Sequence, residues 1–139
     1  MPTAKEFTLT MEDRPGTLGK ICRALADRNV NILAAQSFPS GGKSAVRFVV
    51  DDPTKVRSVL DHEHVTYTEE EVVQVKLTHR AGELARAAQK LGDASININY
   101  LYCGAEPSSS TPLIIFGVNE VSKAAPLLDQ VAAGAAAGR

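Results

Sequence analysis

The sequence predicts an α+β fold in which two similar units follow each other along the chain. One motif occurs twice: Asp13-Arg14-Pro15-Gly16-Thr17-Leu18 with Asn31-Ile32, and His79-Arg80-Ala81-Gly82-Glu83-Leu84 with Asn97-Ile98. Arg14 and Arg80 stand 66 residues apart, and the other matching pairs keep this offset. A fixed offset indicates a duplicated unit. Strand-like and helix-like apolar patterns also follow in the same order in both halves. We therefore expect two domains, at residues 1–70 and 71–139.

The first unit begins with a strand and a helix. Apolar residues alternate with polar ones, as in a half-buried strand: Phe7, Leu9 and Met11. Pro15 and Gly16 end that strand, and we expect a helix to start here with Asp13 near its N-cap. Apolar residues then recur at the spacing of one helical stripe: Leu18, Ile21, Cys22, Leu25 and Ala26.

Two strands, a helix and a last strand complete the first unit. The second strand starts at Ile32 and reaches Pro39-Ser40-Gly41-Gly42, a strong hairpin signal, before a returning strand from Val46 to Val50. Asp51-Asp52-Pro53 then opens a helix with an Asp at its cap, and the buried face of this helix carries Val56, Val59 and Leu60. A strand around Val65 and Tyr67 closes a β-α-β-β-α-β unit.

The second unit repeats this order up to its last element. Glu69-Glu70-Glu71 is expected to be a solvated junction. A strand from Val73 to Leu77, a helix from Leu84 and two strands follow, joined by a loop at residues 104–112. Phe48 and Phe116 are 68 residues apart, so this loop is two residues longer than its counterpart. A helix starts near Val121, but only small residues follow Val131, so we expect the final strand to be missing or supplied by another segment.

Composition and charge exclude several classes of function. The 139 residues carry 15 basic and 16 acidic side chains, a net charge of −1, and the basic ones are scattered. This pattern predicts no nucleic-acid partner and no membrane surface. Without an apolar leader or membrane-spanning run, the protein is expected to be cytoplasmic. Cys22 and Cys103 are expected to be reduced core thiols. His62 and His64 would share one face of a strand, but no carboxylate or thiol joins them, so we expect no metal and no cofactor.

The repeated motif resembles the ACT domain family. In that family a strand, a loop of the form [DN]-x-P-G-x-L and a helix precede an Asn-Ile pair that opens the next strand. The resemblance implies tandem ferredoxin-like βαββαβ units, roughly 5–67 and 72–128, with antiparallel sheets and helices on one face. Proteins of this family bind amino acids and related metabolites and control enzymes of amino-acid metabolism. The chain is similar to the stand-alone double-ACT proteins, so we expect allosteric regulation and no enzyme activity.

The resemblance also implies where a ligand would bind. Helix N-termini offer unpaired amides and a positive dipole end to a carboxylate, here the amides of Gly16, Thr17 and Leu18. Asp13 would accept the ammonium group, and Asn31 or Asn97 would reach the site from a neighbouring unit. The second loop departs from the family pattern, because His79 and Ala81 replace its Asp and Pro; we therefore expect the first loop to be the better site. The predicted ligand-binding set is Asp13, Arg14, Pro15, Gly16, Thr17, Leu18, Asn31, Ile32, His79, Arg80, Ala81, Gly82, Glu83, Leu84, Asn97 and Ile98.

Other interpretations of the same residues stay open. The first loop could be only a helix cap, and Asn31 and Asn97 could be turn residues with local backbone bonds. One rival function is a small acyl-phosphate hydrolase, with Arg14 holding phosphate and Asn31 positioning water. Another is a regulatory subunit that docks onto an amino-acid biosynthetic enzyme through a sheet edge. The expected partners are an amino-acid effector, a second copy of the chain in a homodimer, and a metabolic enzyme.

Overall fold

The chain forms an α+β structure made of two compact units. The computed structural model describes residues 3–104 and 111–137, and within them it contains six strands and four helices. One compact unit comprises Lys5–Glu70; the other comprises residues from Glu71 onward together with the first residues of β1.

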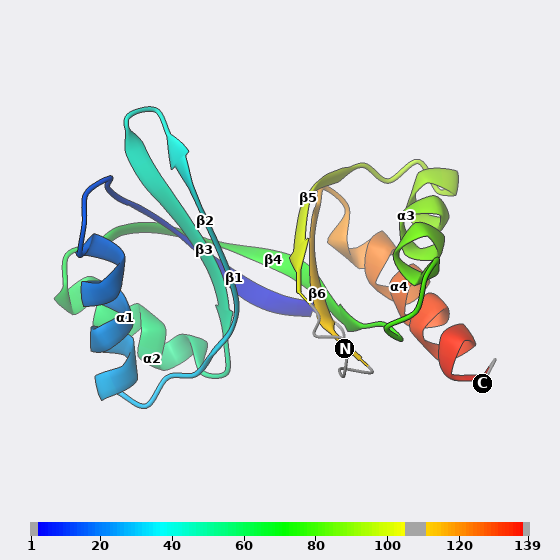
Figure 1. Cartoon of the computed structure of the whole chain (residues 1–139), viewed down its shortest axis with the longest axis horizontal. Helices are drawn as coiled ribbons and strands as arrows, with labels where there is room; N and C mark the ends of the chain where they lie inside the picture. The colour runs from blue at the N-terminus through cyan, green and yellow to red at the C-terminus, as the bar shows by residue number, and fades with distance from the viewer. Residues whose placement is uncertain (1–2, 105–110, 138–139) are drawn as a thin grey trace. The chain divides into compact units, whose positions relative to one another are not determined.

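The first unit has the predicted β-α-β-β-α-β order. Its elements are β1 (Thr3–Glu12), α1 (Thr17–Asp27), β2 (Ile32–Ser40), β3 (Lys43–Val50), α2 (Pro53–His62) and the first half of β4 (Thr66–Lys76). The strand order is β2-β3-β1-β4, and β3 runs antiparallel to both β1 and β2. Both helices lie on the same side of these strands (Figure 1). The predicted fold class is confirmed.

Local sequence explains the turns of this unit. Gly41 and Gly42 both have positive φ, 58° and 80°, as the tight turn between β2 and β3 requires. Asp52 caps α2 by accepting a hydrogen bond from the backbone N–H of Lys55 at 3.2 Å, and Pro53 occupies the first turn. The buried core lies between the helices and the sheet: Phe7, Leu9, Met11, Ile21, Leu25, Val30, Val46, Phe48, Val50, Val56, Val59 and Leu60.

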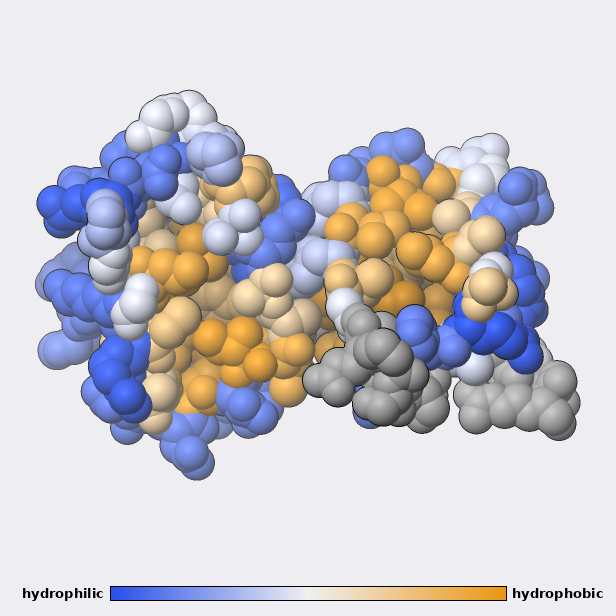
Figure 2. All heavy atoms as spheres, viewed as in Figure 1, coloured by the Kyte–Doolittle hydropathy of each residue, from blue (hydrophilic) through white to orange (hydrophobic). Residues whose placement is uncertain are grey.

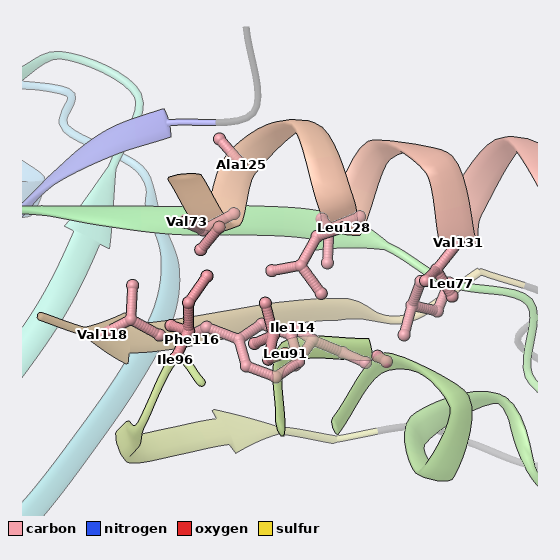
Figure 3. Close-up of a cluster of buried hydrophobic side chains, with 13 residues drawn as sticks. Val73, Leu77, Leu91, Ile96, Ile114, Phe116, Val118, Ala125, Leu128 and Val131 are labelled. Carbon is pink, nitrogen blue, oxygen red and sulfur yellow. The ribbon is translucent and has the colours of Figure 1, made fainter. Parts of the chain in front are cut away.

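The second unit repeats most of this arrangement. Its elements are the second half of β4, α3 (Glu83–Asp93), β5 (Ile98–Cys103), β6 (Leu113–Val118) and α4 (Val121–Ala137), with the strand order β4-β6-β5. Figure 3 shows its core, where side chains from the strands meet side chains from α3 and α4. Most of the predicted loop at residues 104–112 lies outside the described residues.

The edge next to β4 is formed by the start of β1. No strand follows α4 within the described residues, which end at Ala137. The start of β1, Thr3 and Ala4, belongs to the same compact unit as residues 71–137. In the strand order β1 neighbours β4 on the side away from β6. The first residues of β1 therefore occupy the place of the missing strand, the second of the two possibilities that the sequence left open.

One glycine is required by packing across β5 and β6. Gly117 pairs with Tyr100, and a Cβ at Gly117 would lie 2.2 Å from Cζ of the Tyr100 ring. The Tyr100 ring also stacks on Tyr102, with 6.4 Å between their centroids. The aromatic ring therefore covers the backbone of the glycine, and any side chain at position 117 would displace it.

The structure tests three local predictions. Glu69-Glu70-Glu71 lies within β4, and the boundary between the two compact units falls between Glu70 and Glu71, which are both exposed; both carboxylate oxygens of Glu69 accept hydrogen bonds from Arg57 at 2.9 Å. Cys22 is half-buried and packs against the core of the first unit, whereas Cys103 is exposed, so the prediction of a core thiol is wrong for Cys103. His62 and His64 do not share a strand: the first ends α2, and the second, at φ 55°, lies in the turn that follows.

Candidate functional site

The first motif forms a tight turn that leads into α1. Gly16 is the N-cap residue, with φ 90° and ψ −17°. This left-handed backbone favours glycine, since a Cβ makes it costly. Asp13, which was expected near the N-cap, lies three residues earlier, and no side chain among the described residues caps α1. The turn is closed instead by Thr17, whose N–H and hydroxyl both donate to the carbonyl oxygen of Arg14, at 3.4 and 3.1 Å.

Unpaired amides remain at the start of α1. The first helical bond is donated by Lys20 to the carbonyl oxygen of Gly16, at 3.0 Å. Among the described residues none accepts from the amides of Gly16, Leu18 or Gly19. The amides of Gly16 and Leu18 are therefore unpaired, as predicted. The prediction of an unpaired amide is wrong for Thr17, and the unpaired amide of Gly19 was not predicted. Three free amides and the positive end of the helix dipole favour an anion at this point.

A pocket opens beside this turn, entirely within the first unit. Its volume is about 670 Å³, within the range of roughly 300–1,000 Å³ common for small-molecule sites. The motif contributes Arg14 to Thr17, and the ends of β1 and β3 and the turn after α2 supply much of the remaining wall. The lining residues are Thr10, Met11, Glu12, Arg14, Pro15, Gly16, Thr17, Lys20, Ile21, Lys43, Glu63, His64, Val65 and Thr66.

The charges of the pocket suit a ligand with a carboxylate. Among the described residues, three cations line it, Arg14, Lys20 and Lys43, and two carboxylates, Glu12 and Glu63. Arg14 Nε lies 3.3 Å from Glu12 Oε2, but both side chains are largely exposed, so this pair contributes little stability. The pocket therefore holds one more cation than anion, and it offers acceptors for an ammonium group as well.

Only some of the predicted residues of the first motif line this pocket. Asp13 is exposed and does not line the pocket, so it is a poor candidate for the ammonium acceptor. Leu18 lines a smaller, apolar cavity of about 150 Å³ between α1 and strands β2 and β3. Leu18 is 42% exposed, and its repeat partner Leu84 is 39% exposed. Figure 2 likewise shows apolar side chains on the visible surface of each unit.

Asn31 and Ile32 lie at the opposite end of α1 from the pocket. The 11 residues of α1 span about 16 Å. The backbone N–H of Asn31 donates to Asp51 Oδ1 at 3.0 Å, and the N–H of Asp51 donates back to the Asn31 carbonyl at 3.1 Å. Ile32 packs against the core. Asn31 therefore cannot complete the pocket of its own unit, and its backbone role is that of a turn residue.

The second motif has the same backbone geometry as the first. Gly82 caps α3 with φ 95° and ψ −14°. The amide of Glu83 donates to the Arg80 carbonyl at 3.2 Å, and that of Arg86 to the Gly82 carbonyl at 2.9 Å. His79 and Ala81 are exposed. After α3, Asn97 Nδ2 donates to Asn99 Oδ1 at 3.0 Å, and Ile98 packs against the core.

Glu83 distinguishes the second motif from the first. It is only 3% exposed. One of its oxygens lies 2.8 Å from Arg80 Nη2 and the other 3.2 Å from Arg86 Nη1. Hydrogen bonding from Arg80, helped by Arg86 and opposed by burial, holds the pKa of this carboxyl below its usual range.

The predicted set did not include the other titratable residues that line the pocket, namely Glu12, Lys20, Lys43, Glu63 and His64. Lys20 had a local signal, since it stands one turn after Gly16. Lys43 is brought to the pocket by the register of β1 and β3, which pairs it with Glu12. The turn after α2 brings the last two, which nothing in the motif indicated.

Comparison with known proteins finds a family match within the first unit. Residues 6–63 match the ACT domain family model. This ACT match contains the loop at Gly16 and stops before β4. A curated relative, the ACT domain-containing protein ACR3 of Arabidopsis thaliana, is 35% identical over 63 residues, which are 45% of this chain. The chain spans only 14% of the length of that relative.

Solved structures extend the likeness in fold to nearly the whole chain. Protein BT0572 from Bacteroides thetaiotaomicron is 22% identical, with a TM-score of 0.84 over 93% of this chain and 88% of that one. The regulatory subunit of aspartate kinase from Thermus thermophilus, in a ligand-free form, is 17% identical, with a TM-score of 0.65 over 94% and 92%. Both therefore share the fold of this chain.

None of the four helices described is long and apolar enough to cross a membrane.

Proposed function

We propose that this protein is a non-enzymatic regulatory protein that binds an amino acid or a related metabolite in its first unit. The observation that carries the proposal is the pocket at the start of α1, which is lined by Gly16 with its free amide and by cationic side chains. The pocket lies largely in the segment that matches the ACT domain model. The likeness in fold to a regulatory subunit of aspartate kinase supports a role in regulation.

The ligand's two charged groups have separate partners in this proposal. Its carboxylate lies near the amides of Gly16 and Leu18, where Arg14 and Lys20 add positive charge. Its ammonium group is accepted by Glu12 or Glu63, which line the pocket. These two carboxylates replace Asp13, which does not line it.

A second copy of the chain completes the site in this proposal. The side chain of Asn31 is too far along α1 to serve its own pocket, but in a homodimer it can serve the pocket of the other copy. Its amide offers a donor and an acceptor, so it can contact either end of a zwitterion. Leu18, half-exposed beside the free amides, would be covered in the same contact.

Regulation requires no chemistry on the ligand. A ligand of about ten heavy atoms reaches dissociation constants between about 1 mM and 1 μM. Binding then biases the packing of two subunits, or docking to a metabolic enzyme, by a coupling energy of about 1–3 kcal/mol. Such coupling is enough to change the activity of a partner enzyme several-fold.

A thermal-shift screen with the twenty amino acids at millimolar concentration tests this function. A ligand at 100 times its dissociation constant adds about 2.7 kcal/mol of stability. We expect at least one amino acid to raise Tm, and we expect Lys20→Ala and Arg14→Ala to abolish that shift. Lys90→Ala, an exposed lysine of α3, is the control and should keep it. Absence of any stabilising amino acid, or a shift that survives both variants, would contradict the proposal.

Docking onto an enzyme through a sheet edge is the second candidate. In the strand order β2 stands at one end, next to β3 alone, and such an edge can pair with a strand of another protein. Replacing Ala35 with proline in β2 would block such pairing, so it should abolish capture of a dedicated partner in a pull-down. The acyl-phosphate hydrolase gains no support, because Arg14 and Asn31 lie at opposite ends of α1.

A further inference from the structure

The two motifs share a backbone but differ in the side chains on their first helical turn. At the offset of 66, Arg14, Thr17 and Lys20 correspond to Arg80, Glu83 and Arg86. The cap glycines agree within 5° in φ and 3° in ψ, from 90° and −17° to 95° and −14°. The equivalent amide-to-carbonyl bonds close both turns. The side chains of corresponding residues therefore leave the backbone in equivalent places.

In the second unit a carboxylate of the chain itself lies between the two cations. Glu83 contacts both guanidinium groups, and the closest approach is 2.8 Å to Arg80. It is shielded from solvent at 3% exposure. Arg86 is also close to α4, since a Cβ at Gly134 would lie 3.3 Å from its Nη2. This cluster is therefore a formed site for one carboxylate, already filled.

In the first unit the corresponding carboxylate is absent and the space beside the turn is open. Thr17 replaces the glutamate and turns its hydroxyl back to the Arg14 carbonyl. Among the described residues Arg14 pairs only with the exposed Glu12 of β1, and Lys20 makes no ion pair. Both cations line the pocket of about 670 Å³. Because position 17 carries a short polar residue, Arg14 and Lys20 remain available for the carboxylate of a ligand. In the second unit the corresponding cations contact Glu83 of the chain itself.

The C-terminal ends of α2 and α4 also differ, in a way that leaves space for a pocket only in the first unit. At the later offset of 68, the last residue of α2, His62, corresponds to Gln130. In the first unit the chain leaves the helix here, and Glu63 to Thr66 line the pocket. In the second unit α4 continues to Ala137. The helix thus replaces the turn that forms the pocket wall in the first unit.

We propose that Glu83 stands in for the carboxylate of the ligand: the first unit binds a carboxylate between Arg14 and Lys20, whereas the second unit is closed by its own glutamate. This inference rests on the proposed function and sharpens it. The recognised chemistry is a small carboxylate, and each chain binds one ligand although its motif occurs twice.

The first test supplies the missing carboxylate from the chain. Thr17→Glu is compared with the neutral control Thr17→Gln in the full-length protein at low ionic strength. At pH 7 we expect the Glu variant to melt a few degrees above the Gln variant. Its carboxyl pKa would be lowered by the two cations, so the advantage should be complete above the unfolded pKa of about 4.3. It should disappear as pH falls through the folded value. Equal melting temperatures at pH 7 would overturn the inference.

The second test uses succinate as the carboxylate probe, at constant ionic strength against chloride. We expect succinate to raise the Tm of wild type and of Thr17→Gln but not of Thr17→Glu, in which the position is filled. An increment that persists in Thr17→Glu would contradict the inference. Glu83→Thr should open the second unit and raise the stoichiometry of succinate in calorimetry from one to two per chain. If Glu83→Thr does not fold, the pair of Thr17 variants decides alone.

Failure of this inference can be told apart from failure of the proposed function. An amino acid that binds equally well to wild type and to Thr17→Glu would sustain the regulatory function but place the ligand's carboxylate elsewhere. Stabilisation by Thr17→Glu with no amino acid bound would sustain the carboxylate position and contradict amino-acid sensing.

Discussion

Replacing the two cap glycines by alanine separates the stability of the turns from their role in binding. Gly16 and Gly82 have φ of 90° and 95°, and apart from their chain neighbours no atom of the described residues lies within 4 Å of the Cβ that either would gain. The cost of each substitution therefore comes from backbone strain alone. A left-handed conformation costs a residue with a Cβ about 1–2 kcal/mol. We expect Gly16→Ala and Gly82→Ala to destabilise the protein equally, each by about 1–2 kcal/mol.

Binding should respond differently to the two substitutions. Relaxation of the turn at Gly16 would move the free amides of α1 away from the pocket. Gly16→Ala should therefore lower the affinity for the ligand found in the screen at least tenfold, which corresponds to about 1.4 kcal/mol. Gly82→Ala should leave affinity unchanged. Chemical denaturation measures the stabilities and calorimetry the affinities. Equal loss of affinity in both variants, or loss only in Gly82→Ala, would refute the assignment of the site to the first unit.

Three further predictions test the packing, the charges and the caps. Gly117→Ala should cost about 1–3 kcal/mol by overpacking against Tyr100, and much less in a Tyr100→Ala background; additive effects in denaturation would show that the ring is not the obstacle. The pKa of Glu83 is lowered, so its contribution to stability is complete above its unfolded pKa and is lost as pH falls through the folded value; Glu83→Gln should flatten Tm below about pH 4.5, and an unchanged pH profile would contradict this. Asp52→Ala should cost about 0.5–2 kcal/mol through loss of the α2 cap, which urea unfolding would measure; no change would remove Asp52 as a cap.

Local signals account for what the sequence predicted well. The hairpin at Gly41-Gly42, the Asp52 cap and the helix starts each depend on a few adjacent residues whose backbone preferences are strong. The doubled motif also located the turn at Gly16, although it led us to expect Asp13 near the N-cap of the helix. Short-range chemistry therefore defined the elements and one wall of the pocket.

Non-local pairing explains what the sequence could not predict. Lys43 reaches the pocket only through the register of β1 with β3. The start of β1 serves as the edge strand beside β4 because the chain pairs strands that are far apart in sequence. Neither feature leaves a periodic or motif signal in one sequence. The ion cluster of Glu83 did have a local signal, since Arg80 and Arg86 each stand three residues from it.

Amide chemical shifts test the central claim most directly. In ¹⁵N-labelled protein titrated with the amino acid found in the screen, we predict the largest shifts at Gly16, Leu18 and Gly19, whose amides have no acceptor among the described residues. The corresponding amides of Gly82, Leu84 and Ala85 should stay unchanged. Shifts confined to the second motif, or spread evenly over both, would contradict a ligand site at the start of α1.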